Sequence, residues 1–313
     1  MKYLEKSDIQ MHRFQTPILL LGFNRPEHLL ERIYELSLQE IGPLIISIDG
    51  GGMSAREISK IQNVTRTFLK EDTYEFRIHK FNLGLCRHLT GAVTDVLLEN
   101  EYVIILEDDV AVGKNFYKNI QGGINHSREI QGIAAISSFS ATGRGILRFL
   151  TARWRKTRYF NCWGWAVSSK VWQKYKLDLA PFNIEDELNR SRTWNSLSRH
   201  QKKVWLGRFS RVQKAPLSTW DIQFQFMCFR YELVNLAPTK RFSDNTGFDD
   251  VRAEHTSGKP PRWMNLSVRY NGVISKQRSI PKLFFYERVL DSNTIAGDTQ
   301  FVATVRRLKQ RYM

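Results

Sequence analysis

At 313 residues, with 42% hydrophobic and 25% charged residues, the chain has a globular composition and enough length for one large or two modest domains. It has no apolar stretch of transmembrane length, and its polar first residues, Met1 to Gln15, do not resemble a secretory signal. Three widely spaced cysteines (Cys86, Cys162 and Cys228) lack metal-ligand spacing and predict reduced, mostly buried thiols in a cytosolic protein.

The net charge of +16 is unevenly distributed along the chain. Residues 1–141 carry −3 and residues 215–258 carry −2, whereas residues 142–214 carry +13 and residues 259–313 carry +8. Such basic segments can hold phosphate-bearing ligands, nucleic acid or an anionic membrane surface, and they can equally be solvated faces. The charge alone therefore leaves the partner open.

The first part of the chain alternates predicted strands and helices. Apolar runs at residues 17–23 and 103–106 predict buried strands, and further strands are predicted at residues 44–48, 74–78 and 133–137. Helices are predicted after Asn24-Arg25-Pro26, after the capping box of Ser54 and Glu57, from about residue 87 to 98, and near residues 115–120. This β-α-β-α order predicts an α/β fold with a mostly parallel sheet and helices on both faces.

Three carboxylates, Glu107, Asp108 and Asp109, end the strand predicted at residues 103–106. They would repel one another unless a cation or a set of hydrogen-bond donors lay among them. The alternative is that they form the acidic start of the next helix, where the helix dipole favours negative charge.

Other polar residues follow neighbouring predicted strands. Asn24 and Arg25 follow the first strand, and Asp49 follows the second. In an open α/β sheet, all of these residues would lie at the edge where ligands bind. Neither a phosphate-binding P-loop nor a G-x-G-x-x-G pattern is present, and the glycines at residues 50–52 are more typical of a tight turn than of a phosphate cradle.

The ordered motifs Phe23-Asn-Arg-Pro-Glu27, Ile48-Asp-Gly50, Asn82-Leu-Gly84 and Leu106-Glu-Asp-Asp-Val110 resemble the nucleotide-sugar-binding half of GT-A glycosyltransferases. The similarity is greatest to the N-acetylglucosaminyltransferase I type, whose metal motif is Glu-Asp-Asp, and it covers roughly residues 16–260. It implies a Rossmann-like GT-A sheet that binds a nucleoside diphosphate sugar, usually a UDP-sugar, with Mn²⁺ or Mg²⁺.

The resemblance also implies roles for individual residues. Asp109 would be the direct metal ligand, Asp108 would contact the ribose or donor sugar, and Glu107 would face the sugar or acceptor. Arg25 and Asp49 would contact the base and ribose, with Asn24 beside them. A hard divalent cation prefers carboxylate and phosphate oxygens, which agrees with this set.

Further candidate residues lie beyond the acidic triplet. Arg87 follows the Asn82 motif and could reach phosphate, whereas its neighbour His88 is better explained by a helix face without a ligand. Trp163 and Gly164, in the aromatic segment at residues 160–166, could form a wall beside the donor sugar; tryptophans also fill ordinary cores.

Asp221 and His255 complete the predicted site. Asp221, between apolar residues at the start of a predicted helix, could simply cap that helix. By resemblance it would be the general base that deprotonates an acceptor hydroxyl in an inverting transfer. His255 would complete the metal or diphosphate site, although its neighbours Glu254 and Thr256 depart from the family's pattern, and a lone histidine is as readily a surface or core residue.

These assignments predict a nucleotide-sugar-binding half at residues 1–141, an acceptor-side half of the same domain at residues 142–258 and a basic C-terminal extension at residues 259–313. In the extension, residues 301–312 fit a basic amphipathic helix, resting either on an anionic membrane that carries a lipid-linked acceptor or on the domain itself. We expect a cytoplasmic enzyme, peripheral at most, that acts on a glycan or lipid-linked acceptor.

Two other functions compete with this prediction. A two-metal nuclease or phosphoryl-transfer enzyme would need further paired acids on neighbouring strands, and the single Asp49 does not supply them. A non-catalytic carbohydrate- or nucleic-acid-binding module would have no need of Asp221. The ordered motifs favour the glycosyltransferase and make nucleic acid an unlikely partner.

Overall fold

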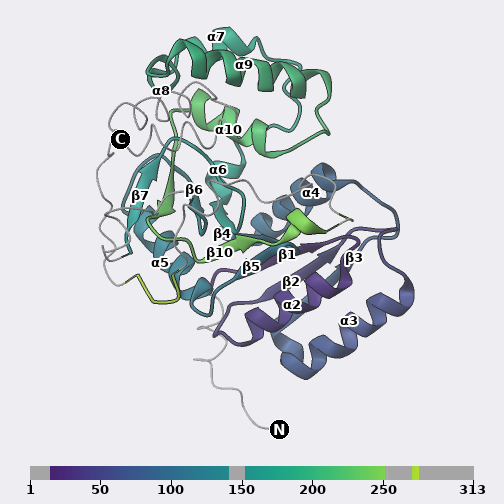
Figure 1. Cartoon of the computed structure of the whole chain (residues 1–313). Coiled ribbons are helices and arrows are strands. Elements are labelled where there is room, and N and C mark those ends of the chain that lie inside the picture. The colour runs from purple at the N-terminus through teal and green to yellow at the C-terminus, as the bar shows by residue number, and fades with distance from the viewer. Residues whose placement is uncertain (1–14, 141–151, 251, 253–269, 275–313) are drawn as a thin grey trace, which may run out of the picture.

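The computed structural model describes residues 15–140, 152–250, 252 and 270–274. Its centre is an eight-stranded sheet in the order β3-β2-β1-β4-β8-β6-β9-β7 (Figure 1). The strands are β1 (Ile18–Gly22), β2 (Leu44–Ile48), β3 (Tyr74–Ile78), β4 (Tyr102–Glu107), β6 (Ile133–Ser137), β7 (Trp154–Thr157), β8 (Trp165–Ser168) and β9 (Val234–Pro238).

Most of these strands run in the same direction. Strands β1 to β4 are parallel to one another, and β6 is parallel to β9. Strand β8 is antiparallel to both β4 and β6, and β7 is antiparallel to β9. A separate two-stranded sheet pairs β5 (Val110–Val112) with β10 (Ser243–Asn245). The predicted mostly parallel α/β sheet is therefore confirmed.

Helices cover both faces of the sheet because its strands alternate their apolar side chains. In β4, Ile104 and Leu106 pack towards one core, and Val103 and Ile105 pack towards the other. The first core is covered by α2 (Pro26–Ser37), α3 (Ala55–Phe68) and α5 (Phe116–Arg128). The second is covered by α4 (Leu85–Glu99), α6 (Ser169–Trp172) and α10 (Asp221–Arg230).

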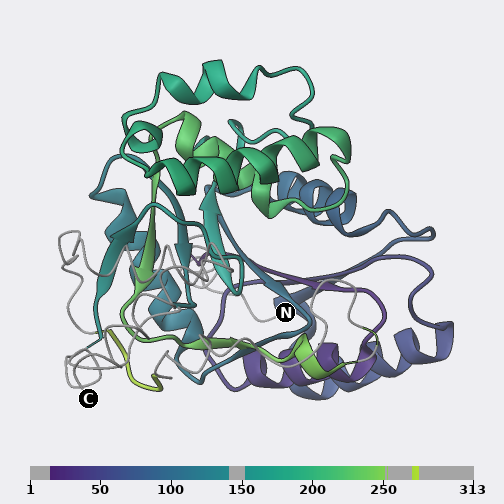
Figure 2. The same ribbon diagram turned by 45° about the horizontal axis from the view of Figure 1, so that its top comes forward.

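A further helical layer packs on the outer side of α10. It consists of α7 (Ile184–Asn189), α8 (Arg192–Asn195) and α9 (Arg199–Lys214), which share a third core of aromatic side chains with α10. Figure 2 shows these helices together over the α4 side of the sheet. Two short 3-10 turns, η1 (Glu71–Thr73) and η3 (Gly247–Asp249), complete the elements described. No helix in this part of the chain is long and apolar enough to span a bilayer.

Local sequence signals explain where the helices before the site begin. Pro26 is in the first turn of α2, where its missing amide hydrogen is not needed. The predicted capping box is formed at α3, where the backbone amide of Ser54 donates to Glu57 Oε2 at 2.7 Å and the amide of Glu57 donates to Ser54 Oγ at 3.3 Å.

The order of the strands indicates where a ligand would bind. From β1 the chain moves outward through β2 and β3 on one side, and then returns to place β4 on the other side of β1. In open α/β sheets, such a reversal marks the ligand-binding position at the carboxyl ends of the two strands. Here those ends carry Arg25, just after β1, and Glu107 to Asp109, at the end of β4.

Candidate functional site

The acidic triplet lies at the turn between β4 and β5. Glu107 is the last residue of β4 and is half-buried, whereas Asp108 and Asp109 form the turn and are buried. Strand β5 follows at Val110, and α5 begins only at Phe116. The alternative that these acids start the next helix is therefore wrong.

Arg25 supplies the cation closest to the triplet. Its Nη2 forms a short hydrogen-bonded ion pair with Asp108 Oδ1, and its Nη1 lies 3.3 Å from Asp109 Oδ2. Burial lowers the pKa of Arg25, but the charges of Asp108 and Asp109 outweigh that effect and raise it. Arg25 is therefore held in its charged form between two carboxylates.

The site nevertheless carries more negative than positive charge. Burial raises the pKa of Asp108 to about 6 although Arg25 opposes the change. Burial also raises the pKa of Glu107 well above its usual value, and the charges of Asp109, Asp108 and Asp221 raise it further. These carboxylates supply oxygen donors of the kind that Mn²⁺ and Mg²⁺ bind, and a divalent cation would relieve their repulsion. Within the described ranges, no group of three or more His, Cys, Asp or Glu residues is arranged to hold a metal ion.

Two charged residues of α2, Arg32 and Glu35, hold the backbone around the acidic triplet in place. The buried Arg32 donates from Nη1 to the backbone carbonyl of Asp108 at 3.4 Å, and its Nε lies 2.9 Å from Glu35 Oε2. The same Glu35 oxygen accepts the Val112 amide at 2.9 Å. These two residues thus fix the backbone on both sides of the acidic turn. Neither residue is among those predicted from the sequence, although a charged residue on the apolar face formed by Leu29 and Ile33 is a signal for such a role.

The Asp49 carboxylate accepts backbone hydrogen bonds from the loops that follow β2 and β3. Its Oδ1 accepts the amides of Gly50 and Leu83, both at 2.9 Å, and its Oδ2 accepts the amide of Gly84 at 3.0 Å. A Cβ atom on Gly50 would lie 2.5 Å from the Phe81 backbone, so only glycine allows this approach. The glycine turn therefore packs two loops together, and the ribose contact of Asp49 stays a prediction.

Arg87 and His88, in the first turn of α4, differ in their surroundings. His88 is buried, and its Nε2 lies 2.7 Å from Ser47 Oγ, while burial lowers its pKa to about 4. It is thus a neutral core histidine, in agreement with the structural interpretation. Arg87 is exposed in the first turn of α4, and its contact with phosphate stays a prediction.

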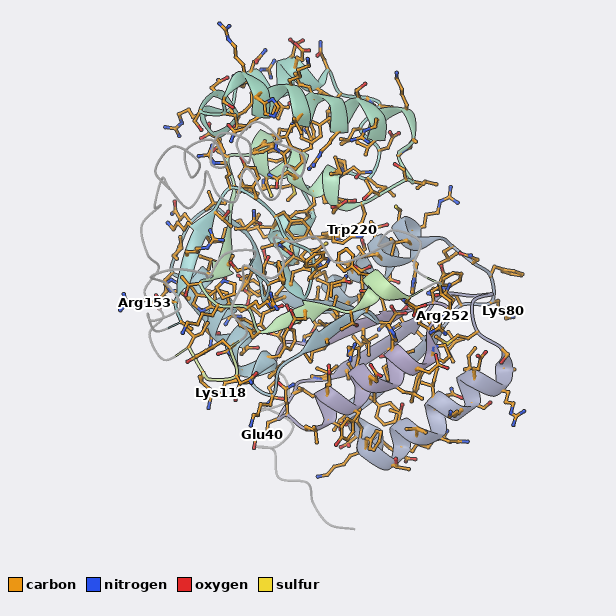
Figure 3. The ribbon with its side chains drawn as sticks, viewed as in Figure 1. Glu40, Lys80, Lys118, Arg153, Trp220 and Arg252 are labelled. Carbon is orange, nitrogen blue, oxygen red and sulfur yellow. The ribbon has the colours of Figure 1, made fainter. Side chains whose placement is uncertain are left out.

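Asp221 is the first residue of α10 and accepts a short hydrogen bond from the Thr219 hydroxyl. The preceding Trp220 is buried in the interior of the molecule (Figure 3). The charge of Asp221 contributes to the raised pKa of Glu107. The pKa of the Cys86 thiol is raised to about 11 by burial and then by Asp221 and Glu107, so both acids lie within electrostatic range of that thiol. The two acids, distant in sequence, are therefore within electrostatic range of each other.

The aromatic segment at residues 160–166 enters the sheet. Trp165 is fully buried in β8, and Gly164, at φ +75°, has no room for a Cβ atom because Ser138 Oγ would lie 2.4 Å away. Trp163 is half-buried and makes edge-to-face ring contacts with Phe139 and Phe248 at centroid distances of 4.6 and 5.9 Å. Packing thus explains Gly164 and Trp165, and the donor contacts of Trp163 and Gly164 stay predictions.

Residues 243–250 and Arg252 are far from the acidic triplet in sequence but contact the acidic turn and the start of α2. The Thr246 amide donates to the Asp109 carbonyl at 2.8 Å. Arg252 bonds Glu27 at 3.0 Å and the Asn24 carbonyl at 3.4 Å, and Asn24 Nδ2 donates to the Arg252 carbonyl at 3.5 Å. Asn24 is therefore tied to this segment. His255 and the helix predicted at residues 301–312 lie outside the described residues.

No protein-family model matches this sequence, and no curated protein matches it significantly.

The three cysteines are free thiols, as predicted, with Cys86 and Cys228 buried and Cys162 half-buried. Burial raises the pKa of Cys162, and the charges of Asp221, Glu107 and Asp109 raise it further. This thiol therefore lies within electrostatic range of Asp221, Glu107 and Asp109 and stays protonated near neutral pH.

Proposed function

We propose that this protein is a metal-dependent glycosyltransferase of the GT-A type. It would transfer a sugar from a nucleoside diphosphate sugar, a UDP-sugar by resemblance, to a hydroxyl of a glycan or lipid-linked acceptor. The proposal joins the ordered sequence motifs to the chemistry of one edge of the sheet.

The observation that carries the proposal is the surplus of carboxylates at the strand reversal. Glu107, Asp108 and Asp109 meet there with Arg25 as their paired cation, and burial, to which the charges of neighbouring acids add, raises the pKa values of Glu107 and Asp108. A folded protein accepts such repulsion where a ligand later relieves it, and active sites are common examples. A divalent cation with a bound diphosphate fits this edge of an α/β sheet.

Asp109, with Asp108 beside it, would hold the metal ion. Bound there, the ion would neutralise the charge that develops on the leaving nucleoside diphosphate. Arg25 would hold the carboxylates in place and offer a second positive charge to the donor. The backbone contacts of Arg32 and Thr246 with Asp108 and Asp109 would keep the acidic turn rigid.

Asp221 would act as the base. It would take the proton from the acceptor hydroxyl while that oxygen attacks the anomeric carbon and the bond to the nucleoside diphosphate breaks. Its position at the start of α10, within the electrostatic field of Glu107, supports a shared site for donor and acceptor. In-line attack of this kind inverts the anomeric configuration.

The two-metal nuclease is less well supported. Such enzymes place a second set of acids beside the first. The neighbouring acid on β2's edge, Asp49, already accepts three backbone amides.

Thermal-shift measurements with UDP, GDP, CMP and their sugars, with and without Mn²⁺, test the proposal. We expect a metal-dependent rise in melting temperature with one nucleotide class, and loss of that rise in Asp109→Asn with the fold retained. Asp95→Asn, an exposed acid on α4, is the matched control and should behave as wild type. The absence of any metal-dependent shift with all the nucleotides would refute the glycosyltransferase assignment.

A further inference from the structure

We infer that the edge of the molecule formed by the β3–α4 and α9–α10 loops binds the surface of an anionic lipid bilayer. The inference does not depend on the proposed function. The edge, called here the basic-apolar rim, consists of six exposed residues. They are the apolar Phe81, Leu83 and Leu217 and the cations Lys80, Arg87 and Lys214.

The two loops of the rim meet at the start of α4. The Cys86 thiol donates to the Leu217 carbonyl at 3.2 Å, which brings the loop after α9 against the first turn of α4. Leu83 lies two residues before Leu85, the first residue of α4. Lys80 lies at the tip of the β3–α4 loop, at the edge of the molecule (Figure 3).

The apolar side chains of the rim are exposed from a well-fixed backbone. Phe81 is 77% exposed, Leu217 46% and Leu83 38%. The backbone beneath them is held by the bonds from Leu83 and Gly84 to Asp49 and by the close approach of Gly50 to Phe81. Since exposed apolar groups of this size are unfavourable in water, a fixed loop that presents them marks a binding surface.

The charge around the rim selects an anionic partner. Helix α9 contains six Lys and Arg residues and no acid, and the exposed Arg211 and Lys214 lie in its last turn, beside the rim. The acids of α4, Asp95 and Glu99, lie in the half of the helix away from the rim. Cations beside exposed apolar side chains are the combination that binds anionic membranes.

The aliphatic members of the rim favour lipid over nucleic acid. An aromatic ring such as Phe81 can stack on a base, but Leu83 and Leu217 have no such interaction and gain only from an apolar environment. A bilayer surface offers hydrocarbon to all three and phosphate to the cations. Docking through the rim would place the carboxyl ends of the parallel strands β1, β2 and β3 near the membrane surface. The strand register aligns Ile78 of β3 with Ile48 and Gly22, so this is the edge that carries the acidic triplet.

Co-sedimentation of the full chain with vesicles tests the inference. We expect binding to phosphatidylcholine vesicles that contain phosphatidylglycerol, and much weaker binding to phosphatidylcholine alone. The double variant Phe81→Ser/Leu217→Ser should bind at least about tenfold more weakly. Leu98→Ser is the matched control because Leu98 is 78% exposed at the opposite end of α4, and this variant should bind as wild type.

Charge-reversal variants test whether vesicle binding depends on the cations of the rim or only on the overall positive charge of the protein. Lys80→Glu and Arg87→Glu should each weaken binding about fivefold or more, because each cation near an anionic bilayer contributes about a factor of five. Lys118→Glu, an exposed lysine on α5, should have little effect. A label that reports on polarity, attached to Phe81→Cys, should enter an apolar environment on anionic vesicles, whereas the same label on Leu98→Cys should not.

Three results would overturn the inference. One is vesicle binding by the double variant at wild-type strength, which would assign any membrane affinity to another part of the chain. Another is a label at position 81 that stays in water on bound vesicles. The third is failure to bind vesicles combined with Phe81-dependent binding of single-stranded oligonucleotides, which would make the rim a nucleic-acid surface.

Discussion

Arg25 lies 3.3 Å from Asp109 and in much closer contact with Asp108, so the two carboxylates share one guanidinium unequally. Asp109, the more weakly paired acid, is the one that the resemblance implies as metal ligand. A divalent cation would thus meet the carboxylate that Arg25 neutralises least.

Arg25→Gln should destabilise the protein and make it depend on metal. Removing one partner of a buried ion pair costs about 3–5 kcal/mol, because the remaining carboxylates lose their neutralising charge. We expect a lower melting temperature in the absence of metal and a larger rise on adding Mn²⁺ than in wild type. Arg128→Gln, whose partner Glu101 is exposed, should change stability by less than about 1 kcal/mol. Equal metal responses in wild type and Arg25→Gln would contradict the prediction.

Asp221→Asn should separate donor binding from transfer. The amide keeps the shape of the side chain but does not accept a proton, so metal-dependent nucleotide binding should persist while transfer falls by about 10²–10⁴-fold. Thr219→Val, which removes the hydroxyl bonded to Asp221, should have a smaller effect. Normal turnover of Asp221→Asn would place the base elsewhere.

Glu35→Gln should weaken metal binding without altering a ligand. Glu35 both pairs with Arg32 and accepts the Val112 amide, so loss of its charge loosens the backbone on both sides of the triplet. We expect about a tenfold loss of Mn²⁺ affinity by calorimetric titration, as is usual for groups that orient metal ligands. Glu31→Gln is the control, since Glu31 also pairs with Arg32 but is exposed. If both variants bind Mn²⁺ alike, Glu35 has no positioning role.

His88 should make stability depend on pH. Its folded pKa of about 4 lies below the ordinary value of 6.5, so the unfolded chain binds a proton that the folded chain does not. The free energy of unfolding should therefore fall as the pH drops from about 6.5 towards 4, by up to about 3 kcal/mol from this group. His88→Gln should lose that part of the slope in urea titrations at several pH values, whereas His200→Gln should keep it. An unchanged slope in His88→Gln would show that His88 is already charged when folded.

Much of the sheet was predictable from the sequence because its strands are short apolar runs bounded by turn residues. The runs at residues 44–48, 74–78 and 133–137 coincide with β2, β3 and β6, and the capping box of Ser54 marks the start of α3 correctly. These signals are local: β2 is an apolar run buried throughout, whereas β3 contains no buried residue and is marked by its alternating apolar and charged residues.

The rest of the fold depends on contacts between distant residues. Trp165 belongs to a central antiparallel strand that inserts between β4 and β6, and nothing in its local sequence distinguishes that strand from an aromatic loop. Likewise, the contact of Arg32 with the Asp108 carbonyl joins residues that are 76 positions apart. The triplet and Arg25 could be selected by residue type and position, and Asp221 by resemblance, but the contacts that support the acidic turn could not be predicted.

The closure of the site by residues 243–252 has a consequence for biosynthesis. Arg252 reaches back across 225 positions to Glu27, and Thr246 reaches back 137 positions to the Asp109 carbonyl. Contacts of such sequence separation form late, because the loop between the partners must close first. A nascent chain that has emerged only as far as β9 already holds Arg25 and the three acids, but it lacks the segment that fixes them. Binding of the proposed donor and metal should therefore begin only once this segment has left the ribosome, after all eight strands of the main sheet have been translated.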